Sequence, residues 1–188
     1  MPTIIQQNLD VRMIHHDLRA APVFDLPKGY AMRSFRPDAG AEDVHAWVEI
    51  HKRADTFFQY TPDVFYESLD RDAARHGERI LFLVDPAGQD IGTISAWNDG
   101  DLTGEDIGRI HWVAIAPEAQ GHGLGKPMLS AACQRLLQLG FASAYLWTST
   151  GRVPAINLYR RFGFEPYHHT PEAAQIWREL SPSLKYPI

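Results

Sequence analysis

The stretch VAIAPEAQGHGLGKPML, residues 113–129, decides the fold of this chain. It begins with an apolar, strand-like run and ends in a segment whose apolar residues recur at helical spacing. Three glycines, Gly121, Gly123 and Gly125, lie in the turn between the two. Glycine adopts positive φ and allows close approach of a ligand, while the first N–H groups of a helix attract anions. A strand, a glycine turn and a helix in this order predict a pyrophosphate-binding site.

The spacing of the glycines selects among phosphate-binding motifs. A nucleotide-triphosphate P-loop needs G-x-x-x-x-G-K-[ST], but Gly121 and Gly125 are too close together and Lys126 is followed by Pro127, which has no hydroxyl. A dinucleotide fingerprint needs a third glycine where the chain has Lys126, and the acidic residue expected further on is missing. The pattern that fits is Q-x-x-G-x-G, at Gln120, Gly123 and Gly125.

Size, charge and composition indicate a globular protein. The chain has 188 residues, of which 45% are hydrophobic and 22% charged, which suits one domain with a sizeable core. Its net charge of −5 argues against a nucleic-acid partner, because phosphate binding needs clustered Lys and Arg. No run resembles a signal peptide or a membrane span, so we expect a cytoplasmic protein without a membrane partner. The one cysteine, Cys133, is expected to be a buried helix residue.

Strands and helices are expected to alternate around this motif. Residues 1–28 mix one strand-like run with loop composition, so we expect an N-terminal arm packed on a single domain over residues 29–188. Strands are expected over 30–35, 80–84, 91–97, 108–117, 142–150 and 164–169. Helices are expected over 43–54, 63–76, from the glycine turn to Gly140, 154–162 and 171–180. The antiparallel hairpin in the middle and the alternation after it predict an α/β protein with a mixed sheet.

A second patch agrees with the first. The segment AINLYRRFGFEP, residues 155–166, fits the pattern A-x-x-L-Y-x-x-x-G-F. Together with Q-x-x-G-x-G it resembles the GNAT superfamily of acyl-CoA N-acyltransferases, and the resemblance covers most of the chain. The family's fold implies a mixed, mostly antiparallel central sheet with splayed cofactor strands and helices on both faces. The resemblance also implies acetyl-CoA as co-substrate.

The resemblance assigns cofactor contacts to particular residues. The pantetheine arm is expected along the backbone of Val113, Ala114 and Ile115. The pyrophosphate is expected at Gln120 and at the N–H groups of the turn, which belong to Gly121, His122, Gly123, Leu124, Gly125 and Lys126. The side chain of Lys126 either adds a charge contact to phosphate or is solvated. Where the family has a cofactor-contacting asparagine this chain has Arg152, so Asn157 either takes its place or faces solvent.

The same resemblance and the chemistry of amide formation suggest catalytic residues. The attacking amine must lose a proton and the leaving thiolate gains from a proton donor. Tyr159 matches the family's tyrosine and is expected to be that donor. The family's glutamate base is replaced by Arg109, a departure that leaves the base open: His111 is the first candidate, and Glu105 and Asp106 are alternatives.

The acceptor is expected to be a primary amine that the sequence does not name. An aromatic segment between the first two predicted helices, with Phe57, Phe58 and Tyr60, is expected either to wall an apolar acceptor pocket or to be ordinary core. No metal is expected, since the histidine pairs lie on strand-like segments where neighbours face opposite ways. The oligomeric state is expected to be a monomer or a homodimer. Two rival functions are a non-catalytic acyl-CoA-binding or regulatory module and, less well matched, an NAD-binding protein.

Overall fold

The computed structural model describes residues 2–55, 58–100, 107–186 and 188. Its seven strands follow the order β2-β3-β4-β5-β6-β1-β7, and the chain divides into two compact units. Unit 1 comprises residues 1–22, 98–110 and 136–188, and unit 2 comprises residues 23–97 and 111–135. Strand β5, Gly108–Ile115, therefore contributes its first residues to unit 1 and its last residues to unit 2.

Unit 2 contains an antiparallel meander. Strands β2, Ala31–Ser34, and β3, Ile80–Val84, pair antiparallel, and β3 pairs in the same way with β4, Asp90–Trp97. A tight turn closes the β3–β4 hairpin, in which the Asp85 N–H donates to the Gln89 carbonyl at 2.9 Å and Gly88 has φ 79°. These elements confirm the hairpin that the apolar runs predict.

The helices of unit 2 differ from the sequence-based expectation at one place. Helix α2, Gly40–Ala54, follows the short 3-10 turn η2, Pro37–Ala39, as expected. The single helix expected over 63–76 is instead two helices, α3 over Pro62–Leu69 and α4 over Ala73–Arg79. Asp70 has φ 58° and ψ −163°, a strained conformation outside the helical regions that ends α3, and the Asp72 carboxylate caps α4 by accepting from the Ala74 N–H at 3.0 Å.

Helices cover both faces of the unit 2 strands. On one face Phe82 packs in a buried cluster with Trp47 of α2 and Phe65 of α3. On the other face a Cβ added to Gly92 of β4 would lie 3.3 Å from the Met128 sulfur of helix α5, Gly125–Gln138. The predicted apolar residues of α2 and α5 are buried, Cys133 among them, except Leu137, which is half-buried, so the two helical stripes are confirmed in all but that position.

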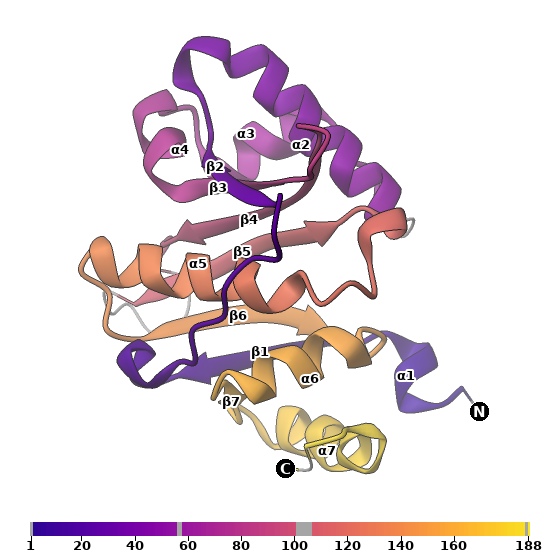
Figure 1. Ribbon diagram of the computed structural model, residues 1–188. Coiled ribbons are helices and arrows are strands. Elements are labelled where there is room, and N and C mark those ends of the chain that lie inside the picture. The colour runs from indigo at the N-terminus through magenta and orange to yellow at the C-terminus, as the bar shows by residue number, and fades with distance from the viewer. Residues whose placement is uncertain (1, 56–57, 101–106, 187) are drawn as a thin grey trace. The chain divides into compact units, whose positions relative to one another are not determined.

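Unit 1 pairs an early strand with late ones. Strand β1, Asp10–His15, is antiparallel both to β6, Ala144–Ser149, and to β7, Glu165–Pro166, and Figure 1 shows it between them. The first residues of β5 pair with β6 in parallel. Because β1 belongs to the expected N-terminal arm, part of that segment is a strand inside the sheet, and a single domain over 29–188 stays a prediction.

The remaining elements of unit 1 surround these strands. Helix α6, Val153–Arg161, and helix α7, Pro171–Leu180, lie where the sequence predicts them, and the shorter elements are α1, Ile4–Gln7, η1, Leu18–Ala20, and η4, Ser181–Ser183. The strand expected over 164–169 is only the two residues of β7. It pairs with β1 only at Met13–Pro166 and Ile14–Glu165. Helix α7 then begins after Thr170, whose hydroxyl accepts from the Ala173 N–H at 3.1 Å. None of the helices described is long and apolar enough to cross a membrane.

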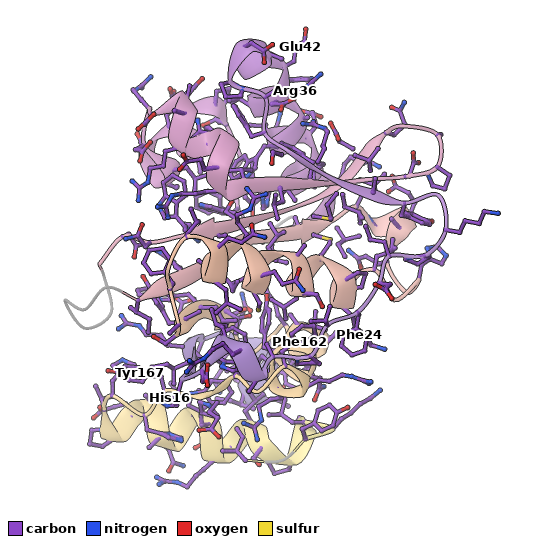
Figure 2. The ribbon with its side chains drawn as sticks, turned by 60° about the vertical axis from the view of Figure 1, so that its left-hand side comes forward. His16, Phe24, Arg36, Glu42, Phe162 and Tyr167 are labelled. Atoms are coloured by element: carbon purple, nitrogen blue, oxygen red, sulfur yellow. The ribbon has the colours of Figure 1, made fainter. Side chains whose placement is uncertain are left out.

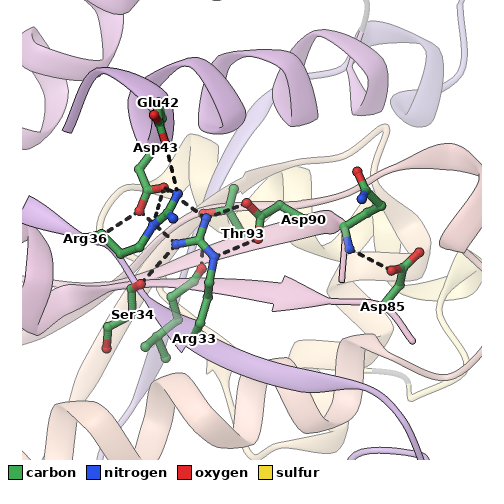
Figure 3. Close-up of polar contacts among 10 residues, drawn as sticks. Arg33, Ser34, Arg36, Glu42, Asp43, Asp85, Asp90 and Thr93 are labelled. Carbon is green, nitrogen blue, oxygen red and sulfur yellow. Dashed lines mark hydrogen bonds and ion pairs between the residues drawn. The ribbon is translucent and has the colours of Figure 1, made fainter. Parts of the chain in front are cut away.

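A charge network fixes the start of α2 and β4 in unit 2. The Asp43 side chain is fully buried, and its carboxylate accepts from Arg33 Nη1 at 2.8 Å and from Arg36 Nη2 at 2.6 Å (Figure 3). Arg33 also donates from Nε to Asp90 at 2.8 Å, and its guanidinium lies 4.2 Å from the centroid of the Phe82 ring. Burial alone would raise the pKa of Asp43, but the hydrogen bonds from Arg36 and Arg33 outweigh it and hold that pKa below its ordinary value.

Candidate functional site

The glycine turn after β5 has the backbone conformation that its composition predicts. A 3-10 turn, η3 over Pro117–Ala119, leaves the strand, and Gly121 and Gly123 follow with φ 81° and 77°. A Cβ on either glycine would meet nothing within 4 Å, so crowding does not explain the choice of residue. The positive φ does, because L-residues with side chains pay about 1 kcal/mol or more in that region.

This conformation leaves a row of backbone donors without acceptors. Within the described ranges, the N–H groups from Gly121 to Gly125 donate no hydrogen bond, and Lys126 N–H makes only a long bond of 3.4 Å to the Gly123 carbonyl. Gly121, His122 and Gly123 are exposed, whereas the Leu124 side chain is buried and anchors the turn. Successive free amides at the start of α5 form a concave site of partial positive charge that suits an anion.

Gln120 has a structural role that the motif alone does not reveal. Its side-chain amide donates from Nε2 to the Ile115 carbonyl at 2.9 Å, which ties the turn to the end of β5. Gln120 therefore has a structural role, to hold the glycine turn in place, in addition to its predicted contact with the pyrophosphate. One of the two lone pairs of the Ile115 carbonyl is thus already used beside the predicted pantetheine contact.

Lys126 and its surroundings are also defined. Its ammonium group lies 5.6 Å from the centroid of the Phe24 ring, and the Phe24 N–H donates to Ser130 Oγ at 3.0 Å. The cation thus makes a cation–π contact beside the first turn of α5.

Strand β5 is irregular where the cofactor residues lie. Trp112 has φ 49°, a left-handed conformation that a tryptophan adopts only at a cost of about 1–2 kcal/mol. Just beyond it, the Ala116 N–H donates to the Ile91 carbonyl of β4 at 2.8 Å, and a Cβ on Gly92 would lie 2.9 Å from the Ala114 carbonyl oxygen. In unit 1 the parallel ladder between β5 and β6 ends at the pair Ile110–Leu146, although both strands run on.

An aromatic cluster surrounds the irregular Trp112 in unit 2. The Trp112 ring lies 5.2 Å from Trp47, 5.4 Å from His51 and 6.0 Å from Tyr60, centroid to centroid. The indole N–H groups of Trp47 and Trp112 are buried and make no hydrogen bond within the part of the chain described. Phe58 is 51% exposed beside this cluster. The predicted aromatic wall is thus part core and part surface, and its Phe57 lies outside the described residues.

The candidate bases are only partly described. His111 is half-buried, and its ring centroid lies 5.0 Å from that of Trp112. Glu105 and Asp106 lie outside the described residues. Arg109, which stands where the family's glutamate is expected, is an ion-pair residue: it donates to the Asp99 carboxylate, which also accepts from the Tyr145 hydroxyl. The departure from the family pattern is therefore accompanied by a local carboxylate partner.

Tyr159 and Asn157 lie on α6 in unit 1. Tyr159 is 5% exposed, and burial raises the pKa of its phenol to about 12, although the nearby Arg152 charge opposes this shift. The phenol is therefore protonated at neutral pH and carries an O–H that can donate. Asn157 already accepts through Oδ1 from the Lys185 N–H at 2.8 Å, which leaves its amide NH₂ for any cofactor contact.

Other groups of chemical interest are accounted for by structure. Burial raises the pKa of the Cys133 thiol to about 12, so this cysteine is a poor nucleophile. No group of three or more possible metal ligands occurs in the described ranges. Of the histidine pairs, His15 uses Nε2 on the Phe162 carbonyl at 2.8 Å and Nδ1 on the Asp17 N–H at 3.2 Å.

Known proteins are similar to this chain in sequence and in fold. The model of the acetyltransferase (GNAT) family matches residues 44–164. A mycothiol acetyltransferase of Arthrobacter sp. (strain FB24) is 33% identical over 148 residues, which cover 74% of this chain and 43% of that protein. The chain thus spans about half the length of the curated relatives it matches.

Solved structures agree on the fold. A GCN5-related N-acetyltransferase from Sphaerobacter thermophilus matches with a TM-score of 0.67 at 22% identity, over 84% of this chain and 48% of that chain. A Mycobacterium tuberculosis protein solved in complex with CoA matches with a TM-score of 0.54 at 21% identity, over 80% of both chains.

Proposed function

Because this chain belongs to the GNAT acetyltransferase family, whose members use acetyl-CoA, we propose that it transfers the acetyl group of acetyl-CoA to a primary amine. In this reaction the amine nitrogen attacks the thioester carbonyl, the new C–N bond forms, the C–S bond breaks, and the thiolate of CoA takes up a proton. No covalent enzyme intermediate is needed, which agrees with the inert Cys133.

One observation carries the proposal: the row of unpartnered N–H groups from Gly121 to Gly125. A diphosphate is the part of acetyl-CoA that needs several donors at once, and backbone amides at a helix start supply them without a competing carboxylate. We assign the diphosphate to these amides and to Lys126, whose cation is held at the first turn of α5.

The pantetheine arm is assigned to β5. Val113, Ala114 and Ile115 follow the left-handed Trp112, and the close approach of Gly92 keeps the β4 side of the strand occupied. Amides of the arm are expected to bond backbone groups of Val113 and Ile115 on the strand's other edge. Ala114, whose carbonyl faces β4, is expected to contact the arm without such a bond. Asn157 remains a proposed contact through its NH₂ group only.

The acid and base roles are assigned by chemistry. Tyr159, protonated because burial raises its pKa to about 12, is proposed to donate a hydrogen bond to the departing thiolate. His111 is proposed as the base that accepts the amine proton, directly or through water. The rival role, an acyl-CoA-binding module without turnover, is favoured by Arg109 in the glutamate position.

For the acceptor, we propose only its chemical class. Curated relatives are named mycothiol acetyltransferase, so mycothiol-related amines belong in any acceptor panel. The exposed Phe58 beside the Trp112 cluster favours an acceptor with an apolar portion. The proposal also includes a cytoplasmic location, a monomer or homodimer, and no nucleic-acid partner.

Thiol release with a mixed amine panel tests the proposal. We expect CoA to appear only when acetyl-CoA and an amine are both present, and calorimetry to show acetyl-CoA binding without the amine. Binding with no turnover on any amine would favour the module. No binding of acetyl-CoA would reject both readings, and a response to NADH instead would favour the dinucleotide alternative.

A further inference from the structure

Three side chains from neighbouring strands of unit 1 meet at a partly exposed surface. Arg12 of β1 and Trp147 of β6 lie directly opposite each other in the antiparallel ladder, and the Arg12 guanidinium carbon is 4.1 Å from the centroid of the Trp147 ring. Arg109 of β5 approaches the same ring at 5.5 Å. Trp147 is 38% exposed, while its sequence neighbours point to the opposite face of the strand and are buried.

The backbone beneath this surface is rigid. Arg12 belongs to a strand bonded on both sides, by β6 along its whole length and by the Tyr167 N–H, which donates to the Arg12 carbonyl at 2.9 Å. Figure 2 labels Tyr167 in the segment that follows β7. Val11 and Met13, on either side of Arg12, are buried, so the strand cannot rotate to hide the arginine. The guanidinium is therefore held in place from a fixed strand.

The two arginines differ in charge balance. Arg109 is neutralised by Asp99, and its side chain is 13% exposed. Arg12 makes no ion pair with any carboxylate in the described ranges, in contrast to Arg19, Arg33 and Arg36. One positive charge at this surface is thus oriented but not neutralised.

Stacking determines what the free arginine can bind. The Arg12 guanidinium carbon lies over the indole ring, and a guanidinium carries five N–H donors in a planar group. Those donors match the two oxygens of a carboxylate, and the open part of the Trp147 ring offers an apolar surface next to them. A planar or aromatic molecule with a carboxylate satisfies both features.

We propose that Arg12 and Trp147 form a carboxylate-binding subsite that selects amine acceptors carrying an acidic group. This inference rests on the proposed acetyl transfer for its role, but the binding itself does not. Arg109 is a positioning residue in this subsite. Its charge is already paired with Asp99, and it contacts the Trp147 ring that it helps to orient.

A binding experiment tests the subsite without any turnover. N-acetylphenylalanine and its uncharged amide are titrated against the protein by ligand-observed NMR. We expect the acid to bind about three- to tenfold more tightly than the amide, the range for a partly exposed, charge-assisted bidentate pair. Arg12→Gln should abolish that preference. Arg19→Gln, which removes an exposed arginine of the same unit, should leave it unchanged. Equal binding of acid and amide to the wild type, or a preference that survives in Arg12→Gln, would overturn the subsite.

A kinetic experiment tests its role in acceptor choice. Phenylalanine and 4-(aminomethyl)benzoic acid are compared with their amides, and kcat/KM is measured for each pair. We expect the acid to be favoured through a lower KM, by the same factor as in binding. Arg12→Lys should lose most of this preference, because an ammonium lacks the planar pair of N–H donors of a guanidinium.

Selective binding with no turnover of any probe would retain the subsite and reject acetyl transfer to these amines. Turnover with no acid preference would reject the subsite alone. Thermal unfolding of each variant separates these effects from a loss of folding.

Discussion

At the residue scale, the glycine turn makes a prediction with an internal control. Gly123 and Gly88 both have positive φ, 77° and 79°, and an added Cβ would meet nothing within 4 Å at either. Gly123→Ala and Gly88→Ala should each cost about 1 kcal/mol of stability. Only Gly123→Ala should weaken acetyl-CoA binding, by about tenfold, because it re-aims phosphate-binding amides.

Calorimetric titration of both variants with acetyl-CoA checks this prediction. Wild-type affinity in both variants would show that the turn does not hold the diphosphate. A similar loss in both would indicate a general effect of the added strain.

Tyr159 gives a second residue-scale prediction. Tyr159→Phe removes the phenol that burial keeps protonated, so kcat should fall by at least about tenfold while the Kd of acetyl-CoA stays the same. Tyr167→Phe, in the same unit but assigned no role, should leave kcat unaltered. Steady-state kinetics on both variants decide the matter, and a normal kcat in Tyr159→Phe would remove the residue from the mechanism.

At the scale of elements, the Asp43 network joins β2, α2 and β4. Asp43→Asn removes the charge on which Arg33 and Arg36 converge and should lower the free energy of unfolding by about 3 kcal/mol. The exposed neighbour Glu42, 3.7 Å from Arg36, provides the control: Glu42→Gln should cost less than about 0.5 kcal/mol. Urea unfolding of the two variants measures the difference, and equal costs would contradict a dominant role for Asp43.

The same network has a defined pH dependence. The folded pKa of Asp43 lies below the ordinary value of 3.8, so its contribution is complete above about that pH. It is lost as the pH falls further, through the lower folded pKa. Wild-type unfolding free energies should therefore drop more steeply below pH 4 than those of Asp43→Asn.

His15 links β1 to the end of α6, and its protonation also makes the stability of the fold depend on pH. Burial lowers its pKa below 6.5, outweighing the hydrogen bond to Phe162, so the folded state favours the neutral ring. The unfolded chain binds the proton more readily, and stability should fall as the pH drops below about 6.5, by at most about 1.4 kcal/mol per pH unit from this group. His15→Gln should flatten that slope between pH 7.5 and 5, as urea unfolding across that range would measure.

For single elements, the sequence predicts the features that depend on apolar periodicity and on turn residues. The apolar stripes of α2 and α5 and the glycines at the turn have local causes, and the structure confirms them. The break at Asp70 lies outside what the pattern predicts, because a single residue with positive φ has no periodic signal. The last strand was predicted too long because its length depends on β1, which is far away in sequence.

The candidate site was predictable only in its backbone part. The motif indicates which amides form the turn, but Gln120 bonding Ile115 and Trp112 at φ 49° are tertiary results without a sequence signature. The Arg12–Trp147 contact depends on strand register, which single-sequence patterns do not provide.

At the scale of the whole molecule, acetyl-CoA should act as a stabilising ligand. At a concentration of about 100 times Kd, binding to the folded state adds about 2.7 kcal/mol, which corresponds to a rise in Tm of roughly 5–10 °C for a chain of this size. NADH at the same concentration should give no rise. A thermal-shift assay with both compounds measures this, and an unchanged Tm with acetyl-CoA would contradict the proposed co-substrate.

The position of β1 between β6 and β7 has a consequence for how the protein is made in the cell. The Leu9 N–H bonds the Thr150 hydroxyl, 141 positions later in the chain. A ribosome adding about 5–20 residues per second therefore holds β1 without its partners for on the order of ten seconds. During that time Val11 and Met13 lack the neighbours that bury them, so the nascent chain should depend on chaperone capture, and slower translation should lower its soluble yield.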